Sequence, residues 1–237
     1  MLRADVRAAI ALSAILVDIE GTTTPVEFVH TTLFGYARAR VQEFLERHEA
    51  DGDVQADIAL LRAEHAAETA PPPMASVAAY VRWLIDQDRK STGLKSLQGK
   101  IWEEGYRAGE LQGAVYPDVP PALARWREHG TEIAIFSSGS VQAQRNLFAT
   151  TTAGDLTRFI RGYFDTTTGP KTAVQSYAQI AAALSHAPSD MRFLSDVVAE
   201  LDGARAAGMR TALCVRGGQT AVPSGGHQVI RTFDDVP

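Results

Sequence analysis

Two carboxylates stand two residues apart where an apolar run gives way to a loop. Asp18 and Glu20 follow the run Ala14–Val17 and precede Gly21 and three threonines. A short apolar run flush against turn residues is typical of a strand buried on both faces. Ligands of open α/β sheets bind outside the carboxyl ends of such strands, and ionised groups there cost solvation energy unless a cation or substrate uses them. The segment therefore favours a functional site over a solvated acidic turn.

Three further positions place polar side chains at predicted element ends. Ser137 follows the predicted strand Glu132–Phe136, Lys171 opens a helix, and Asp196 ends another strand. Taken singly, Ser137 fits a helix N-cap, Lys171 a solvated surface residue, and Asp196 a charge at a helix start. Parallel strands bring their carboxyl ends to one edge of a sheet, so we expect these side chains to converge with Asp18. Their combination at one edge favours a shared site.

Each of these residues has a definite chemical use. The Asp18 carboxylate can act as a nucleophile and form an acyl-phosphate. A phosphate dianion repels it, so a divalent cation is needed, and magnesium suits because it takes hard oxygen ligands beside phosphate and water. Asp196 would supply the second carboxylate, and Glu200, one helical turn further, would orient that site without contacting the metal. Glu20 would protonate the leaving oxygen, since crowding among carboxylates raises the pKa of such an acid.

Substrate binding is expected from two places. Ser137 and the backbone N–H groups of Ser138 and Gly139 begin a helix, and a helix N-terminus binds phosphate. Lys171 would hold the phosphoryl group and offset the charge of Asp18.

The elements that must position these residues are of two kinds. Residues 27–113 show helical periodicity, with four helices expected near 28–45, 53–69, 76–88 and 94–106 and Ser76 as the N-cap of the third. After Val115, strands alternate with helices, which implies a parallel sheet with right-handed crossovers. We therefore predict an α/β fold, a Rossmann-like parallel sheet core (residues 1–24 and 115–237) with an inserted all-helical cap domain (25–114).

Composition narrows the functional classes. The 237 residues are 45% hydrophobic with a formal net charge of -5, and no Lys/Arg block suggests nucleic acid as a partner. No segment reaches the roughly 18 apolar residues of a membrane span. Arg3 and Arg7 precede an apolar stretch that loosely imitates a signal peptide, but no convincing cleavage site follows. Cys214, the single cysteine, is expected in the core. We predict a cytoplasmic monomer that acts on a small-molecule phosphate ester.

Three strings in this chain resemble a known family. They are Leu16-Val17-Asp18-Ile19-Glu20-Gly21-Thr22-Thr23-Thr24-Pro25, Ser137-Ser138-Gly139-Ser140-Val141 and Ser195-Asp196-Val197. With Lys171, they resemble the haloacid-dehalogenase superfamily of aspartate-nucleophile phosphatases. The second acid of the first motif is usually Asp in these phosphatases, and here it is Glu20. With Glu20 in the first of them, the three strings look like those of the enolase-phosphatases of methionine salvage.

The resemblance implies an activity and a role for each site residue. The implied reaction enolises 2,3-diketo-5-methylthiopentyl-1-phosphate and then removes the phosphate, giving 1,2-dihydroxy-3-keto-5-methylthiopentene. By this similarity, Asp18 is the nucleophile and a ligand of one Mg²⁺ per chain. Glu20 gives the metal its backbone carbonyl and acts as acid and base through its side chain. Asp196 is the other metal ligand, and the substrate is held by Ser137, Ser138 and Lys171.

Other functions remain open from the sequence. A magnesium-dependent phosphatase of the same superfamily acting on a phosphosugar is the nearest alternative. A metal-free dehalogenase would leave Asp196 and Glu200 unexplained, and a non-catalytic phosphate-dependent regulator would predict loss of Asp18.

Four cap residues are candidates to contact the methylthio group, although each also fits a role in the cap core: Phe28, His30, Phe34 and Trp102.

Overall fold

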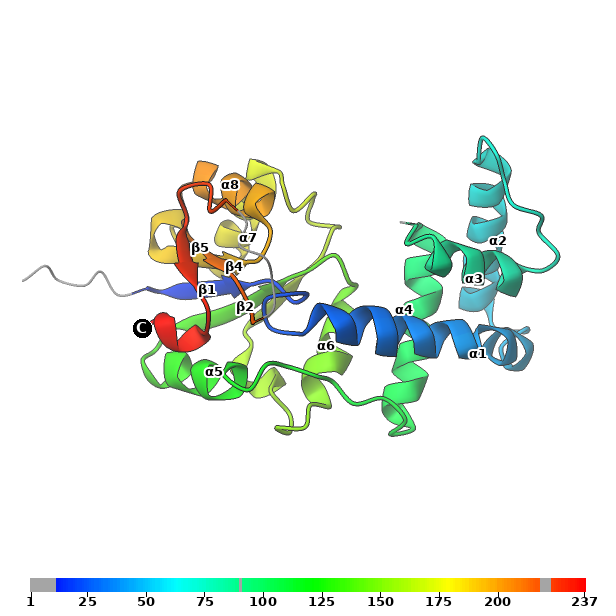
Figure 1. Ribbon diagram of the computed structural model, residues 1–237, viewed down its shortest axis with the longest axis horizontal. Helices are drawn as coiled ribbons and strands as arrows, with labels where there is room; N and C mark the ends of the chain where they lie inside the picture. The colour runs from blue at the N-terminus through cyan, green and yellow to red at the C-terminus, as the bar shows by residue number, and fades with distance from the viewer. Residues whose placement is uncertain (1–11, 90, 218–222) are drawn as a thin grey trace, which may run out of the picture. The chain divides into compact units, whose positions relative to one another are not determined.

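The first strand lies inside a parallel sheet. The computed structural model describes residues 12–89, 91–217 and 223–237, so Arg3 and Arg7 lie outside the described residues. Within them the chain forms a six-stranded sheet in the order β3-β2-β1-β4-β5-β6 (Figure 1). Every pairing in it is parallel. The strands are β1 (Ala14–Val17), β2 (Glu132–Phe136), β3 (Gly162–Phe164), β4 (Met191–Ser195), β5 (Arg210–Cys214) and β6 (Gln228–Ile230).

The strand order reverses at β1. Ile15 pairs with Ile133 of β2 on one side and with Arg192 of β4 on the other. All four residues of β1 are fully buried, as the uninterrupted apolar run predicts. Successive strands proceed toward β3 on one side of β1 and toward β6 on the other, so a topological switch point lies between β1 and β4. Ligands of open α/β sheets bind at the carboxyl ends of strands at such a point.

Helices cover both faces of the sheet. Above it in Figure 1 lie α7 (Val174–Leu184) and α8 (Val198–Ala206), and below it lies α5 (Val119–Glu128). The helices α7 and α8 contribute Tyr177 and Leu201 to a buried cluster with Leu16 of β1. The helix α5 contributes Trp126, whose ring packs on Phe233 at 5.2 Å between centroids. Short 3-10 helices complete the connections: η2 (Thr157–Phe159), η3 (Pro188–Asp190) and η4 (Phe233–Asp235).

By its internal contacts the chain divides into two compact units. The described part of the sheet unit comprises residues 12–23, Pro117–Phe136 and residues 158–237 with the gap noted above, and the helical unit comprises Thr24–Tyr116 and Ser137–Thr157. The helical insertion after the first strand agrees with the predicted fold class. This grouping places residues 137–157 with the helices, whereas the predicted boundaries place them with the sheet. The predicted domain boundaries stay a prediction.

The helical unit has its own apolar core. It contains the π-helix η1 (Phe28–Leu33) and the α-helices α1 (Phe34–Arg47), α2 (Gly52–Ala67), α3 (Val77–Asp86), α4 (Thr92–Arg107) and α6 (Val141–Ala149). Buried side chains such as Val41, Leu61 and Leu97 form one cluster from several helices. Ser76 caps α3, because its hydroxyl accepts the Ala79 N–H at 3.1 Å, and this confirms the predicted cap.

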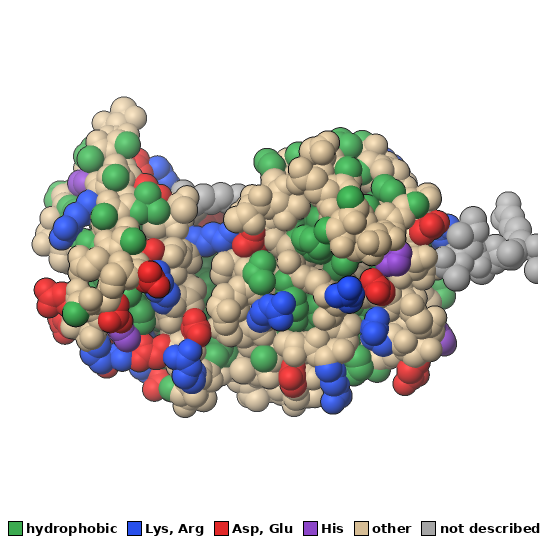
Figure 2. All heavy atoms as spheres, turned by 180° about the vertical axis from the view of Figure 1, so that it is seen from behind, with side chains coloured by type: hydrophobic (Ala, Val, Ile, Leu, Met, Phe, Trp, Pro, Cys, Tyr) green, Lys and Arg blue, Asp and Glu red, His purple; other side chains and the backbone are tan. Residues whose placement is uncertain are grey.

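Charged side chains lie on the surface, and the single cysteine lies in the core. On the face shown in Figure 2, Lys and Arg side chains lie interspersed with Asp and Glu. Of the helices in the described ranges, none combines the length and the apolar character that a membrane span requires. Cys214, at the end of β5, is buried with 2% exposure, which confirms the prediction of a core residue.

Candidate active site

Asp18 stands at the carboxyl end of β1 as a buried carboxylate. Its N–H continues the sheet by donating to the carbonyl of Leu194 at 3.0 Å, and the residue is 4% exposed. One carboxylate oxygen, Oδ1, pairs with the ammonium group of Lys171. The other, Oδ2, accepts the hydroxyl of Thr22 at 3.3 Å. Two contacts therefore hold the Asp18 side chain at the carboxyl end of β1, where the topological switch point lies.

The loop after Asp18 is tied to its own backbone. The carbonyl of Ile19 accepts the N–H groups of Thr22 and Thr23 at 3.2 and 2.9 Å. The hydroxyl of Thr23 donates to the Asp18 carbonyl at 3.1 Å. Thr22 and Thr23 are both fully buried. Serial threonines in this loop thus satisfy buried backbone acceptors that would otherwise cost free energy.

Asp196 lies directly against this loop. It follows β4, the neighbour of β1 at the switch point. A Cβ atom added to Gly21 would lie 2.0 Å from Oδ2 of Asp196, and Gly21 has a φ of +72°. Only glycine combines that close approach with a left-handed backbone. The structure therefore brings Asp196 to the loop that carries Asp18 and Glu20.

Lys171 joins two carboxylates. Its ammonium group pairs with Asp18 and also lies 2.8 Å from Oε2 of Glu200, and its side chain is only 10% exposed. Glu200, in the first turn of α8, also accepts the Ser195 hydroxyl at 3.0 Å. The carbonyl of Lys171 accepts the hydroxyl of Tyr177, which fixes the backbone from which the lysine reaches the site.

The cluster carries more negative than positive charge. Burial, and then repulsion from Asp18 and Glu200, raises the pKa of Asp196 to about 7. Burial also raises the pKa of Glu200, against the opposing attraction of Lys171. Burial by itself lowers the pKa of Lys171, but the two carboxylates outweigh it and hold the pKa above its usual value. One lysine facing three carboxylates leaves a deficit of positive charge that a cation would relieve.

The donor set fits a hard divalent cation. No cluster of three or more His, Cys, Asp or Glu side chains arranged for a metal occurs in the described ranges. Asp18 and Asp196 offer two carboxylates at the loop that carries Gly21. Magnesium is usually bound through one or two carboxylates, with water and substrate phosphate completing its shell. The carboxylates of Asp18 and Asp196 are compatible with that donor set.

Glu20 lies in the loop after β1, as expected, but Ser137, Ser138 and Gly139 do not begin a helix, because α6 starts only at Val141. Glu20 is half-buried in the loop between Asp18 and Gly21. Ser137 directly follows β2 and is 8% exposed, and its hydroxyl accepts the Gly139 N–H at 3.2 Å. The N-cap of α6 is Ser140, whose hydroxyl accepts the Ala143 N–H, so Ser137 is not the helix cap. Ser137 and the exposed Ser138 belong to the helical unit.

The aromatic candidates pack against one another inside the helical unit. The rings of Phe34 and Trp102 stack with centroids 6.2 Å apart, and His30 meets Phe34 edge-on at 5.1 Å. Trp102 is 9% exposed and donates its indole N–H to the Leu33 carbonyl at 2.7 Å. Phe28 and Phe34 are partly buried against the same core. Trp102 therefore has the contacts of a core residue, whereas His30 is exposed, and the role of all four at the methylthio group stays a prediction.

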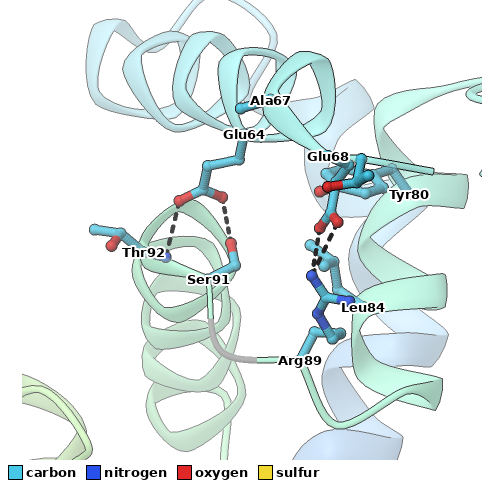
Figure 3. A pocket seen from close by; sticks show the side chains of 9 residues that line it. Glu64, Ala67, Glu68, Tyr80, Leu84, Arg89, Ser91 and Thr92 are labelled. Carbon is cyan, nitrogen blue, oxygen red and sulfur yellow. Dashed lines mark hydrogen bonds and ion pairs between the residues drawn. The ribbon is translucent and has the colours of Figure 1, made fainter. Parts of the chain in front are cut away.

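A cavity in the helical unit has a different character. It holds about 360 Å³ and lies among α2, α3 and α4 (Figure 3). Its polar groups pair with one another: Glu64 accepts the Ser91 hydroxyl and the Thr92 N–H, and Arg89 forms a two-contact ion pair with Glu68 at 2.7 and 2.9 Å. It contains none of the residues that the sequence singled out. These satisfied contacts stabilise the start of α4 and offer no reactive group.

Two contributors to the site were missed in the sequence. Thr22 contacts Asp18 directly, and Arg216 donates to the carbonyl of Thr22. Arg216 follows the apolar run that ends at Val215. A cation directly after a predicted buried strand was the one feature of the sequence that could have indicated a role for Arg216 at the site. Single arginines in such positions are common, and nothing in the local pattern indicates their partners.

The fold and the site define a class of protein. Residues 12–208 match the family of haloacid dehalogenase-like hydrolases, and the chain belongs to this family.

The chain is also similar over nearly its whole length to individual proteins. The chain is 53% identical to an enolase-phosphatase E1 from Synechococcus elongatus, with 96% of this chain and 98% of that protein covered. It is 50% identical to an enolase-phosphatase E1 from Sorangium cellulosum, covering 97% and 99%. Among solved structures, the UTR4 protein of Saccharomyces cerevisiae superposes with a TM-score of 0.78 at 34% identity, covering 95% of this chain and all of that one.

Proposed function

We infer that this protein is an enolase-phosphatase of methionine salvage, a phosphoric monoester hydrolase that forms an acireductone. Its substrate would be 2,3-diketo-5-methylthiopentyl-1-phosphate, which is enolised and then dephosphorylated to 1,2-dihydroxy-3-keto-5-methylthiopentene. One observation carries the inference: Asp18, the carboxylate at the switch point, is followed by Glu20 in a chain that is 53% identical to an enolase-phosphatase E1 over nearly its whole length.

We propose that Asp18 is the nucleophile of the phosphatase step. Its carboxylate oxygen attacks phosphorus, the bond from phosphorus to the substrate oxygen breaks, and an aspartyl-phosphate forms. The leaving oxygen takes a proton from Glu20. Glu20 then removes a proton from water, which attacks the aspartyl-phosphate and releases phosphate. The sum of this step is one enol phosphate and one water converted to one enediol and one phosphate, with Asp18 and Glu20 regenerated.

The surrounding cations make attack by an anion on an anion feasible. Lys171 already pairs with Asp18, and in the complex its ammonium group would also hold phosphoryl oxygens. Ser137 and Ser138 would donate to the same oxygens, a proposal supported by their position after β2. Magnesium, bound by Asp18, Asp196 and the Glu20 carbonyl, would supply positive charge that offsets the phosphoryl group. Glu200 would act through Lys171 and Ser195, which it contacts.

A screen of phosphate esters tests the proposal. Purified protein is given the diketo substrate, phosphosugars and para-nitrophenyl phosphate, each with Mg²⁺ and with a chelator. Phosphate release and ultraviolet absorbance of the enol are followed together. We expect release with Mg²⁺ from the diketo ester, with enol absorbance. A protein that prefers phosphosugars by a wide margin would instead be a phosphosugar phosphatase, and absence of turnover on every ester would overturn the enzymatic proposal.

Two further predictions accompany the function. We propose that the protein acts as a monomer in the cytoplasm. Light scattering coupled to size-exclusion chromatography, and fractionation of cells that produce it, would test both.

A further inference from the structure

A buried arginine lies beside the loop of the active site. Arg216 follows β5 and is 4% exposed, so its guanidinium group is almost fully removed from water. A buried cation is costly unless its hydrogen bonds and charge are matched by neighbours. Its partners therefore indicate what the arginine stabilises.

The first partner is the loop that follows Asp18. Nε and Nη2 of Arg216 donate to the carbonyl of Thr22 at 2.9 and 2.5 Å. Two parallel N–H donors on one carbonyl fix both its position and its direction. The N–H of Thr22 donates to Ile19 at 3.2 Å, so both backbone polar groups of Thr22 are held.

The second partner joins three separate segments of the sheet unit. Nη1 of Arg216 donates to Oδ2 of Asp118 at 2.7 Å, and the same oxygen accepts the N–H of Phe233 at 2.6 Å. The guanidinium carbon lies 4.6 Å from the centre of the Phe233 ring, a cation–π distance. Asp118 and the η4 segment thereby fix the guanidinium plane, which in turn sets the direction of its bonds to Thr22.

Thr22 transmits this placement to the carboxylate. Its hydroxyl donates to Oδ2 of Asp18 at 3.3 Å, while Oδ1 pairs with Lys171. The orientation of Oδ2 thus depends on where the backbone of Thr22 is held. We propose that Arg216 is a positioning residue for the reaction: through Thr22, it sets the orientation of the Asp18 carboxylate.

The kinetic part of this inference rests on the proposed role of Asp18 as nucleophile. Arg216→Lys keeps the charge, which limits misfolding, but one ammonium group cannot reproduce the planar fork that contacts Thr22 and Asp118 together. Misplacement of a reacting group lowers kcat more than it changes substrate binding. For phosphate release from para-nitrophenyl phosphate we expect kcat to fall about 10- to 100-fold with KM changed less than about threefold.

Arg125→Met is the matched control. Arg125 donates to the carbonyls of Phe233 and Val236 at 2.8 and 3.1 Å. The control loosens the same C-terminal segment without removing a contact to Thr22. We expect Arg125→Met to keep the kcat of the unsubstituted protein. A loss of kcat equal to that of Arg216→Lys would show that Arg216 acts only by anchoring this segment and would overturn the proposal.

A double substitution tests the route through Thr22. Thr22→Val removes the hydroxyl that contacts Asp18 and keeps the side-chain shape. If Arg216 acts through that hydroxyl, the combined variant Arg216→Lys/Thr22→Val should lose no more kcat than the worse single variant. Losses that multiply would show two independent effects and would refute the route.

Hydrogen exchange supplies a readout that needs no activity. In Arg216→Lys, the amide hydrogens of Thr22 and Thr23 should exchange at least about tenfold faster, while the amides of β4 keep their exchange rates. In the control Arg125→Met, the amides of Thr22 and Thr23 should also keep their exchange rates. Unchanged exchange at Thr22 in Arg216→Lys would refute the inference even if kcat fell. A protein inactive on every ester would overturn the role of Asp18 but would leave this exchange comparison decisive for Arg216.

Discussion

Substitution of Gly21 by alanine tests whether Asp196 must lie against the Asp18 loop. The added methyl group would meet Oδ2 of Asp196 at 2.0 Å and Cγ at 2.6 Å. To reach an ordinary contact of 3.4 Å, the carboxylate must move by about 1.4 Å. Asp196 can escape only by turning away from the loop. Displacements of about 1 Å can cost 10²-fold in rate, so we expect kcat for phosphate release to fall at least about 100-fold.

Gly21→Ala should also lower stability simply because it places alanine in a left-handed conformation, and a control variant measures that cost. Gly21 has a φ of +72°, and a left-handed alanine costs roughly 1–2 kcal/mol of stability. Gly130, in the same unit, has a φ of +80° with no atom within 4 Å of an added Cβ. Gly130→Ala should therefore show a similar loss in the free energy of unfolding and full activity.

The assay is phosphate release as a function of Mg²⁺ concentration, with urea denaturation of both variants alongside. If Asp196 is a ligand, Gly21→Ala should also need about 10- to 100-fold more Mg²⁺ for half-maximal rate, the usual scale for disturbing a metal ligand's surroundings. A folded Gly21→Ala protein with the rate and Mg²⁺ requirement of the unsubstituted protein would refute the placement of Asp196 at the site.

Three further substitutions test individual roles. Asp18→Asn should lower phosphate release at least about 10³-fold with the far-ultraviolet circular dichroism unchanged, and substantial turnover would contradict a covalent mechanism. Glu20→Asp should slow an ester with an alkyl alcohol leaving group, such as a phosphosugar, by about 10²- to 10⁴-fold but para-nitrophenyl phosphate far less, because an alkoxide must be protonated as it leaves and nitrophenolate need not be; equal losses would contradict the role as acid. The folded pKa of Asp196, about 7, exceeds the unfolded value of about 3.9, so its contribution to stability is present below about pH 4 and is lost as the pH rises through 7. In chelator, Asp196→Asn should therefore gain stability relative to the unsubstituted protein between pH 5 and pH 8 in urea denaturation, and an identical difference at both pH values would contradict the raised pKa.

Local patterns predicted the elements that carry the site. The apolar run before Asp18 and the run Glu132–Phe136 match β1 and β2 residue for residue, because turn or loop residues bound both. At another strand, the observed end differs from the end of the apolar run. The strand β5 begins at Arg210, one residue before the apolar run Thr211–Val215, since pairing with Arg192 of β4 decides where the ladder starts. Tertiary pairing of this kind leaves no local signal.

The sequence did not reveal how the side chains are held. Residues 28–33 were expected in an α-helix but form a π-helix, whose hydrogen bonds the apolar spacing does not specify. Lys171 was expected to offset Asp18, and the ion pair is present, but its second partner, Glu200, was assigned only an orienting role. The bonds from Arg216 to Thr22 and Asp118 join residues far apart in the chain. Only the assembled sheet unit brings them together.

The placement of β1 has a consequence for folding while the protein is synthesised on the ribosome. Ala14 pairs with Glu132 on one side and with Met191 on the other, so β1 finds neither neighbour until long after it has been translated. The helices of the insertion make short-range contacts and can form in the interval. Non-local pairing is slow, and an apolar strand with both edges open invites aggregation. Early in synthesis, β1 therefore stays an unpaired apolar strand until residues 132–136 and 191–195 have been translated.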